Sequence, residues 1–187
     1  YFCIIRRYDI RKSGELKVTI QFLLANIGNE ITFPQLAKGA NLKSPTTAQK
    51  FTGYIEETYL IFLVNRFEPK IKLREKNPKK VYCIDNRIAY LLNPTLSENK
   101  GALLENLVAV ELKRRGKTIH YYTNKDRTKT DFVIQENKEI VEAIQVCYDP
   151  TAPKTGEREE KTLLRTMGEL KLKKGLILTF EMEKEKK

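Results

Sequence analysis

The chain has 187 residues, which suits one large domain or two small ones, and 41% of its residues are hydrophobic. It contains no apolar run long enough to cross a membrane as a helix, so we expect no membrane partner. The net charge of +11 is uneven: residues 1–92 carry 16 Lys and Arg against 8 Asp and Glu, and residues 93–187 carry 19 against 16. A cationic excess in one half predicts a surface there that binds a polyanion such as DNA.

The cysteines and the histidine argue against a structural zinc site. Cys3, Cys83 and Cys147 are scattered along the chain, and His120 is the single histidine. Structural zinc needs four Cys or His ligands, usually in closely spaced pairs. We therefore interpret the cysteines as small hydrophobic residues of a protein in the reducing cytoplasm.

Three helices are predicted in the first third of the chain. Residues 16–27 hold apolar side chains at helical spacing, and Gly28 is expected to cap this helix. A second helix is predicted over 32–39, and Ser44 is expected to cap a third, which begins with a proline. The third helix should turn Ala48, Phe51, Thr52 and Ile55 inward and Thr46, Thr47, Lys50 and Tyr54 outward.

A basic β-hairpin is predicted to follow these helices. Two runs rich in β-forming residues, 59–67 and 81–85, flank a connection, and the span 66–80 has seven Lys or Arg and two Glu. Three helices followed by a basic hairpin indicate a winged helix-turn-helix, whose third helix enters the major groove while the hairpin contacts phosphate. The alternative is a helical bundle with a solvated charged face. The predicted nucleic-acid-binding residues are Thr46, Thr47, Lys50, Tyr54, Arg66, Lys70, Lys72, Arg74, Lys76, Lys79 and Lys80.

The second half predicts a different fold. After a short helix over 87–92, residues 93–101 are rich in Asn, Pro, Ser and Gly and are interpreted as a linker. We place a winged-helix domain at 1–95 and a second domain at 96–187. The second domain is predicted to run helix 102–115, strands 118–123, 130–135 and 140–147, helix 157–172 and strand 175–180. This αβββαβ order is that of the restriction-endonuclease-like fold, so the predicted class is α/β, of the α+β kind.

That order places a set of candidate catalytic residues, but the set is degenerate. Cleavage of a phosphodiester with Mg²⁺ needs carboxylates to hold the metal and usually a lysine nearby. Glu105 lies in the predicted helix, and Asp131 opens a strand. Gln145 and Cys147 share one face of the next strand, where Glu and Lys would be needed, and we expect them to point towards Asp131. Mg²⁺ is thus the one cofactor to consider, held weakly by Glu105 and Asp131.

Both carboxylates also have ordinary interpretations. Glu105 alone suits an exposed helix position, and Asp131 alone suits a turn before a strand. The core of the predicted helix is assigned to Leu103, Leu104, Leu107, Val108 and Leu112. The nearest lysine to the candidate site by sequence is Lys129, in the preceding turn.

Several segments together resemble a known family. GALLENLVAVELKRRG, TDFVIQ, IQVCYD and GLILTF, with YIEETYLIFLV and KVYCIDN upstream, resemble the C-terminal region of prokaryotic predicted AAA-type ATPases. The resemblance implies an N-terminal ATPase domain, a winged helix and a nuclease-like domain of unassigned role. Glu105 and Asp131 match the family's acids, whereas Gln145 and Cys147 stand where many relatives have Glu and Lys. This chain has no phosphate-binding loop, so the resemblance implies that the ATPase domain of the same protein is missing from it.

The sequence therefore predicts a DNA-binding accessory region of a prokaryotic AAA-type ATPase with an inactive nuclease-like domain. One alternative is an active Mg²⁺-dependent DNA nuclease. The other is a protein-interaction module whose basic hairpin binds an acidic partner.

Overall fold

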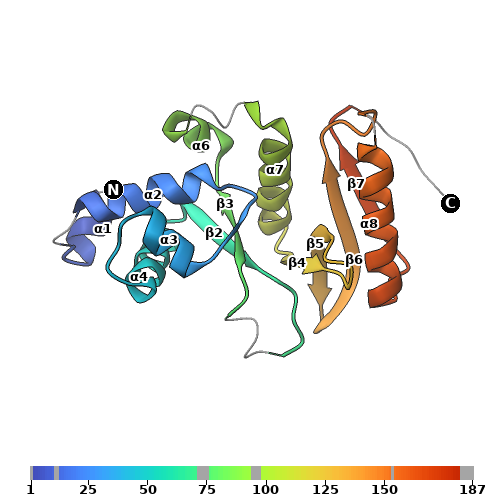
Figure 1. The fold of residues 1–187 in the computed structure, drawn as a ribbon, viewed down its shortest axis with the longest axis horizontal. Coiled ribbons are helices and arrows are strands. Elements are labelled where there is room, and N and C mark those ends of the chain that lie inside the picture. The colour runs from blue at the N-terminus through green and yellow to red at the C-terminus, as the bar shows by residue number, and fades with distance from the viewer. Residues whose placement is uncertain (1, 11–12, 71–75, 94–97, 153, 182–187) are drawn as a thin grey trace.

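The computed structural model describes residues 2–10, 13–70, 76–93, 98–152 and 154–181, which form a mixed α/β structure with two sheets (Figure 1). The predicted α+β class is thereby confirmed. The first half contains α1 (Phe2–Arg7), α2 (Ser13–Ala25), β1 (Glu30–Ile31), α3 (Phe33–Gly39), α4 (Pro45–Glu56), β2 (Ile61–Asn65), β3 (Lys79–Cys83) and α6 (Asn86–Leu92). The second half contains α7 (Lys100–Arg114), β4 (Thr118–Thr123), β5 (Lys129–Glu136), β6 (Glu139–Cys147), α8 (Thr155–Leu170) and β7 (Gly175–Thr179).

The helices α3 and α4 begin where the sequence predicts. The Thr32 side chain and the Gln35 side chain bond each other's backbone N–H groups, which forms a capping box at the start of α3. The Ser44 hydroxyl accepts from the N–H of Thr47, and a proline occupies the first turn of α4. All four residues expected on the inner face of α4 are buried: Ala48, Phe51, Thr52 and Ile55.

Gly28 has a different role from the predicted one. The helix α2 ends at Ala25, before this glycine. Gly28 adopts a φ of 77°, in the left-handed region, and its N–H donates to the carbonyl of Val81 at 2.9 Å. The glycine therefore attaches the chain after α2 to β3 instead of capping the helix.

The first sheet is antiparallel, with the order β1-β3-β2. Register runs from Ile61 opposite Cys83 to Asn65 opposite Lys79, so β2 and β3 form a two-stranded ribbon. In Figure 1 the chain after β2 and the chain before β3, residues 66–70 and 76–78, extend away from the helices. Lys72 and Arg74 of the predicted basic hairpin lie outside the described residues.

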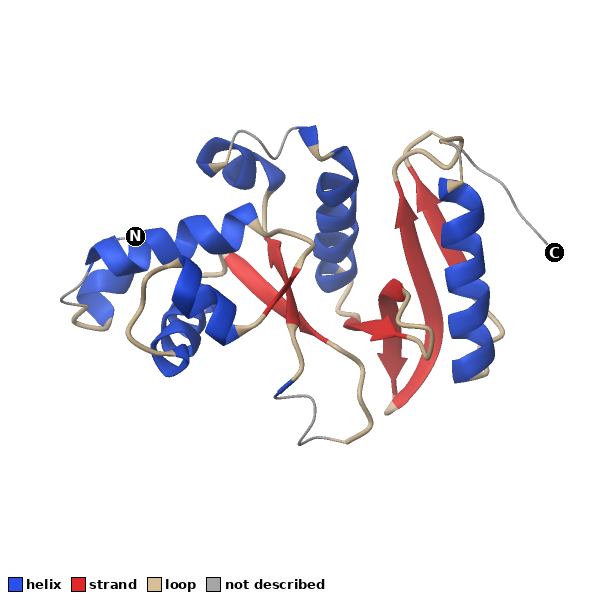
Figure 2. Cartoon of the chain, viewed as in Figure 1, coloured by secondary structure: helices blue, strands red, loops and turns tan. Residues whose placement is uncertain are grey.

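The second half follows the predicted αβββαβ order. Its sheet has the order β4-β5-β6-β7, in which β4, β5 and β6 are antiparallel and β7 runs parallel to β6 after the crossover through α8. Figure 2 shows α7 and α8 on opposite sides of this sheet, with α7 on the side of the first sheet. Apolar residues on the two faces of β5 and β6 fill separate cores, one towards α7 and one towards α8.

The two halves share one of these cores. Val64 of β2 and Tyr82 of β3 pack in the same cluster as Ala109 of α7, Tyr121 of β4 and Phe132 of β5. These five side chains bury apolar surface against one another, and this packing attaches the hairpin to the second half. Any site built on β3 and α7 is therefore held by both halves of the chain.

The predicted inner face of α7 is partly wrong. Leu107 is 56% exposed, whereas the buried residues of this helix are Asn106 and Ala109. The Asn106 side chain accepts from the N–H of Cys83 and donates to its carbonyl, both at 2.8 Å, and donates to the Asn86 side chain at 2.7 Å. Because Asn106 bonds the end of β3, it turns α7 so that Leu107 faces outward.

Candidate functional site

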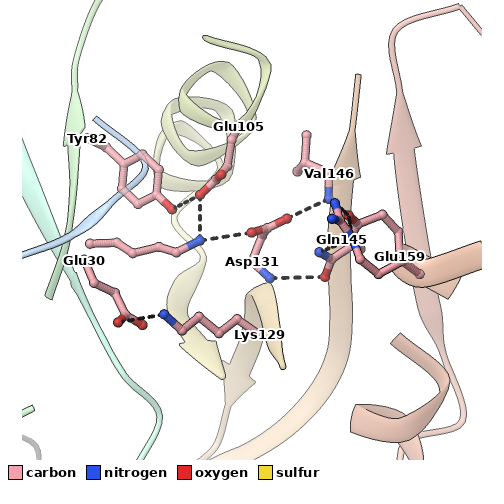
Figure 3. A network of polar contacts seen from close by, with 10 residues as sticks. Glu30, Tyr82, Glu105, Lys129, Asp131, Gln145, Val146 and Glu159 are labelled. Carbon is pink, nitrogen blue, oxygen red and sulfur yellow. Dashed lines mark hydrogen bonds and ion pairs between the residues drawn. The ribbon is translucent and has the colours of Figure 1, made fainter. Parts of the chain in front are cut away.

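A buried ion-pair triad lies where β3, α7 and β5 meet. The Lys80 ammonium is 2.8 Å from Glu105 Oε1 and 2.9 Å from Asp131 Oδ1. The three side chains are 7%, 16% and 12% exposed, in that order. Figure 3 shows Glu105 and Asp131 pointing towards one another from the helix and the strand. The two predicted acids thus come together around a lysine from the other half of the chain.

The position of Asp131 depends on an irregularity in β5. His120 pairs with Val133 while Tyr122 pairs with Thr130, so β5 has one residue more than β4 over this stretch. Such a β-bulge re-aims a side chain. Val133 packs towards α8 and Phe132 towards α7. Asp131 also turns to the α7 side, where it contacts Lys80.

Further hydrogen bonds fix both carboxylates. The Tyr82 hydroxyl donates to Glu105 Oε1 at 2.6 Å, and the N–H of Val146 donates to Asp131 Oδ2 at 3.0 Å. Lys80 and Tyr82 lie two residues apart in β3, so both project from the face of the strand that meets α7. Gly28 approaches from another side, where an added Cβ would lie 3.4 Å from Glu105 Oε2. The carboxylates are therefore held in one geometry by groups from β3 and β6, with the turn at Gly28 close to Glu105.

The electrostatics of the triad follow from its burial. Burial alone would lower the pKa of Lys80, but Asp131 and Glu105 outweigh it and raise that pKa above its ordinary value. Burial, then the neighbouring Asp131, raises the pKa of Glu105, which Lys80 partly offsets. Burial, reinforced by Glu105, also raises the pKa of the Tyr82 hydroxyl well above its ordinary value. Lys80 is thus a permanent cation at neutral pH, and Tyr82 a neutral donor.

The predicted four-residue cluster forms only in part. The Gln145 side chain accepts from the N–H of Asp131 at 3.4 Å, and its amide donates to Glu159 of α8 at 2.6 Å. Gln145 therefore links the backbone of Asp131 to α8, and neither of these bonds involves the carboxylate of Asp131 or Glu105. Cys147 is buried, and burial followed by nearby Glu159 raises the pKa of its thiol. Gln145 does reach Asp131, as the sequence predicts, but it contacts the backbone N–H, while the bulge turns the Asp131 carboxylate towards Lys80. That Cys147 also points towards Asp131 stays a prediction.

Two lysines differ from their expected positions. Lys129, the nearest lysine by sequence, pairs with Glu30 at 2.9 Å and not with Glu105 or Asp131. Lys80, expected on the surface of a DNA-binding hairpin, is 5% exposed and contacts both carboxylates. The prediction that Lys80 binds phosphate is therefore corrected. The sequence did not reveal the burial of Lys80, because counting charges along the hairpin assumes that every lysine faces solvent.

The other predicted DNA-binding residues are distributed over α4 and the hairpin. Thr46 and Lys50 are exposed, whereas Thr47 is half-buried and its hydroxyl lies 3.1 Å from that of Ser44. The ring of Tyr54 stacks on that of Tyr8 with centroids 3.7 Å apart, which covers one of its faces. On the hairpin, Lys70 and Lys76 are exposed and Arg66 and Lys79 are half-buried. A hollow between α4 and the hairpin is lined partly by Thr46, Gln49, Lys76 and Lys79.

The triad does not fit a divalent metal as it stands. Mg²⁺ needs oxygen ligands around it, and here an ammonium already lies between the two carboxylates. The residues that the structure describes contain no group of three or more His, Cys, Asp and Glu side chains arranged to hold a metal ion. The arrangement can balance buried charge and join β3, α7 and β5. In its present form it offers no metal-activated water.

Comparisons with known proteins divide the chain at the end of the predicted linker. Residues 5–99 match the family described as a domain of unknown function, DUF8612, and residues 100–187 match the domain of unknown function DUF4143. The uncharacterized protein MJ1544 of Methanocaldococcus jannaschii is 36% identical over 180 residues, which are 92% of this chain and 39% of that protein. An uncharacterized protein of Haemophilus influenzae is 25% identical over 150 residues, 78% of this chain and 37% of that protein.

This chain therefore spans less than half the length of the curated relatives that it matches. No solved structure matches it. Within the described residues, no helix combines the length and the apolar character needed to cross a membrane.

Proposed function

We propose that this chain, which belongs to the DUF8612 family and carries a DUF4143 domain in its second half, binds DNA and does not cleave it. The observation that carries the second part is the position of Lys80. Its ammonium lies between Glu105 and Asp131, where a nuclease of this kind would hold Mg²⁺. A buried ammonium with two carboxylate partners is costly to displace, because its removal leaves two buried negative charges facing each other.

DNA binding by the first half rests on exposed cations beside a helix. Lys50 on α4 and Lys70 and Lys76 on the hairpin are exposed, and a hollow lies between the two elements. A helix in the major groove with lysines on the flanking phosphates would use this arrangement. The excess of eight positive charges in residues 1–92, from 16 Lys and Arg less 8 Asp and Glu, supports the same surface.

The larger context follows from coverage and resemblance. The relatives are more than twice as long as the segment they share with this chain. Its motifs resemble the C-terminal region of prokaryotic predicted AAA-type ATPases. We therefore infer an accessory region in the cytoplasm that acts beside an ATPase domain of the same protein.

An active Mg²⁺-dependent nuclease is the second candidate, and one observation favours it. Lys80 contacts both carboxylates, so the structure supplies the lysine that Cys147 does not. If Mg²⁺ and DNA displaced the ammonium, the same three residues would form the usual chemical set. Cleavage by the wild type that is lost in both Asp131→Asn and Lys80→Met, at a temperature where circular dichroism shows both variants folded, would establish this candidate and refute the proposal of an inactive domain.

The deciding experiment measures binding and cleavage in the same samples. A labelled 20-base-pair duplex is titrated with the chain over a salt series, with and without Mg²⁺ or Mn²⁺. We expect salt-dependent binding, with log K falling by about 0.9 per phosphate contact for each unit of log salt, and no cleavage above background. Absence of duplex binding at low salt would refute the DNA-binding part.

Matched variants separate the proposed surface from general charge. Lys50, Lys70 and Lys76 are replaced by Glu in one variant, and the exposed Lys138, Lys161 and Lys173 in the control. Both variants change the net charge equally, but only the first should lose most duplex affinity. Equal losses would show non-specific attraction. Unchanged duplex binding with lost binding of an acidic polypeptide would favour the protein-interaction alternative.

A further inference from the structure

A second hollow lies at the junction of the two halves, away from the surface of α4. We call it the junction hollow. Its wall on one side is the base of the hairpin, and on the other side it is formed by β4, the turn that follows and the start of β5. A short parallel bridge between Arg66 and Tyr121, and a bond from the N–H of Phe67 to the Tyr121 carbonyl at 2.7 Å, hold the two walls together. The residues that line it include Glu30, Arg66, Phe67, Tyr122, Lys125 and Arg127.

The charge in the junction hollow is predominantly positive. Arg66, Lys125, Arg127 and Lys129 line it, against Glu30 and Glu68. Glu30 forms an ion pair with Lys129 at 2.9 Å, as Figure 3 shows, so the charges of these two residues cancel. Lys125 and Arg127 are exposed and form no ion pair with any carboxylate that the structure describes. The hollow therefore presents an excess of cationic groups to an anion.

Arg66 contributes an unsatisfied donor to this surface. Its Nε atom is buried and has no hydrogen-bond partner among the described residues, while Nη2 reaches the Thr123 carbonyl at 3.4 Å. A buried donor without a partner is costly in a folded protein, and a bound anion is one way to satisfy it. Guanidinium groups are the preferred partners of phosphate because they offer several donors in a fixed plane.

Aromatic rings lie beside these cations. The rings of Phe67 and Tyr122 are tilted with centroids 6.4 Å apart, and both line the junction hollow half-buried. The Tyr122 hydroxyl donates to Glu169 at 3.0 Å, which orients the ring. Cations that follow a phosphate backbone, together with aromatic rings on which bases stack, are the combination that binds single-stranded nucleic acid. A duplex keeps its bases stacked inside and would not use these rings.

We propose that the junction hollow binds a single-stranded segment of nucleic acid, with Arg66, Lys125 and Arg127 on its phosphates and Phe67 and Tyr122 against its bases. The inference extends the proposed function to a second surface and rests on that function for the class of ligand. Lys129, which lines the hollow, begins β5 two residues before Asp131.

The test uses the whole chain and a labelled 15-mer of thymidine, read by fluorescence anisotropy over a salt series. Each phosphate contact with a single strand contributes a slope of about 0.7 in log K against log salt. Replacing Lys125 and Arg127 by Ala should therefore flatten the slope by about 1.4 if each contacts one phosphate. The control replaces the exposed Lys161 and Lys173 by Ala and should leave the slope unchanged.

A second variant tests the rings. Phe67→Leu keeps an apolar side chain but removes the stacking face, so it should lower affinity for the 15-mer roughly tenfold without changing the slope. A 15-unit abasic oligomer, which has the phosphate backbone but no bases, should bind the wild type more weakly than the thymidine 15-mer does. Equal binding of both oligomers, or equal slopes in the Lys125 and Arg127 variant and its control, would overturn the proposal.

The remaining outcomes separate this site from others. Full displacement of the 15-mer by 10 mM inorganic phosphate at constant ionic strength would show a site for free phosphate and overturn the proposal for a strand. The variant with Glu at Lys50, Lys70 and Lys76 should lose duplex binding but keep the binding of the 15-mer. If that variant loses both ligands, the junction hollow is not a separate surface. If the wild type binds the 15-mer but not the duplex, only the function proposed for α4 is refuted.

Discussion

Replacing Lys80 with methionine should destabilise the fold strongly at pH 8. Methionine has a similar length but no charge, so Glu105 and Asp131 would remain buried without a cation. Breaking a buried ion pair by removing one partner typically costs about 3–5 kcal/mol. For a chain of this size each kcal/mol lowers Tm by about 2–4 °C, so a fall of roughly 6–20 °C is expected.

The same variant should depend on pH in a defined direction. Without Lys80 the two carboxylates repel each other, and burial already raises the pKa of Glu105. The folded variant therefore holds a proton at a pH where the unfolded chain has released it. A folded-state pKa raised above the unfolded value gives stability that is present below the unfolded pKa and lost as the pH rises through the folded pKa. The deficit relative to wild type should be small near pH 5 and largest at pH 8.

Thermal unfolding followed by circular dichroism at pH 5, 6, 7 and 8 measures both effects. The control adds Glu105→Gln and Asp131→Asn to Lys80→Met, which removes the buried charges and should recover much of the lost stability and abolish the extra pH dependence. A Lys80→Met variant that unfolds within about 1 kcal/mol of the wild type at pH 8, with the same pH profile, would refute the view that the triad holds the halves together.

Three further predictions concern other parts of the chain. Asn106→Ala should lower the free energy of unfolding, measured in urea, by at least about 1–3 kcal/mol, because the N–H and carbonyl of Cys83 lose their partner; unchanged stability would mean that water replaces the amide. The thiol of Cys147 should react with a disulfide reagent at pH 7.5 much more slowly in the folded than in the unfolded chain, since burial raises its pKa; equal rates would contradict its position. Phe51→Ala should cost about 3–5 kcal/mol, whereas Lys50→Ala should keep the stability and weaken duplex binding; the reverse pattern would contradict the orientation of α4.

The secondary structure was predictable because local patterns dominate it. The periodic apolar residues of α4 and its capping residue Ser44 were predicted and are confirmed, and the helix predicted over 32–39 is confirmed with Thr32 as its cap. The order of elements in the second half is confirmed for the same reason. The one clear error within α7, at Leu107, comes from a buried polar residue: Asn106 orients the helix through hydrogen bonds that hydrophobic periodicity does not register.

The candidate site was only partly predictable because tertiary contacts build it. Sequence reasoning found Glu105 and Asp131 and brought Gln145 to Asp131, but it did not predict that the bulge in β5 turns the Asp131 carboxylate away towards Lys80. It missed Lys80 as their partner because the lysine comes from the other half of the chain. One signal was present: Lys80 and Tyr82 are two residues apart in a strand, so a cation and a hydroxyl share one face and both suit a carboxylate partner.

Removing Lys80 without filling its space should convert the triad into a weak metal site. In Lys80→Ala the two carboxylates remain fixed by Tyr82 and the N–H of Val146, and the lost side chain leaves room for water. Mg²⁺ binds through one or two carboxylates and keeps several waters. If the site binds with a Kd of about 1 mM, 10 mM MgCl₂ stabilises the variant by about 1.4 kcal/mol and raises its Tm by roughly 3–6 °C.

The wild type should show no such rise, because its ammonium already neutralises the carboxylates, and neither should Lys80→Ala combined with Asp131→Asn. All samples are compared with NaCl at equal ionic strength, so that screening is the same in each. An equal rise in the wild type that disappears with Asp131→Asn would mean that Mg²⁺ displaces the ammonium. The triad would then be the resting state of an active nuclease, and Lys80 its catalytic lysine.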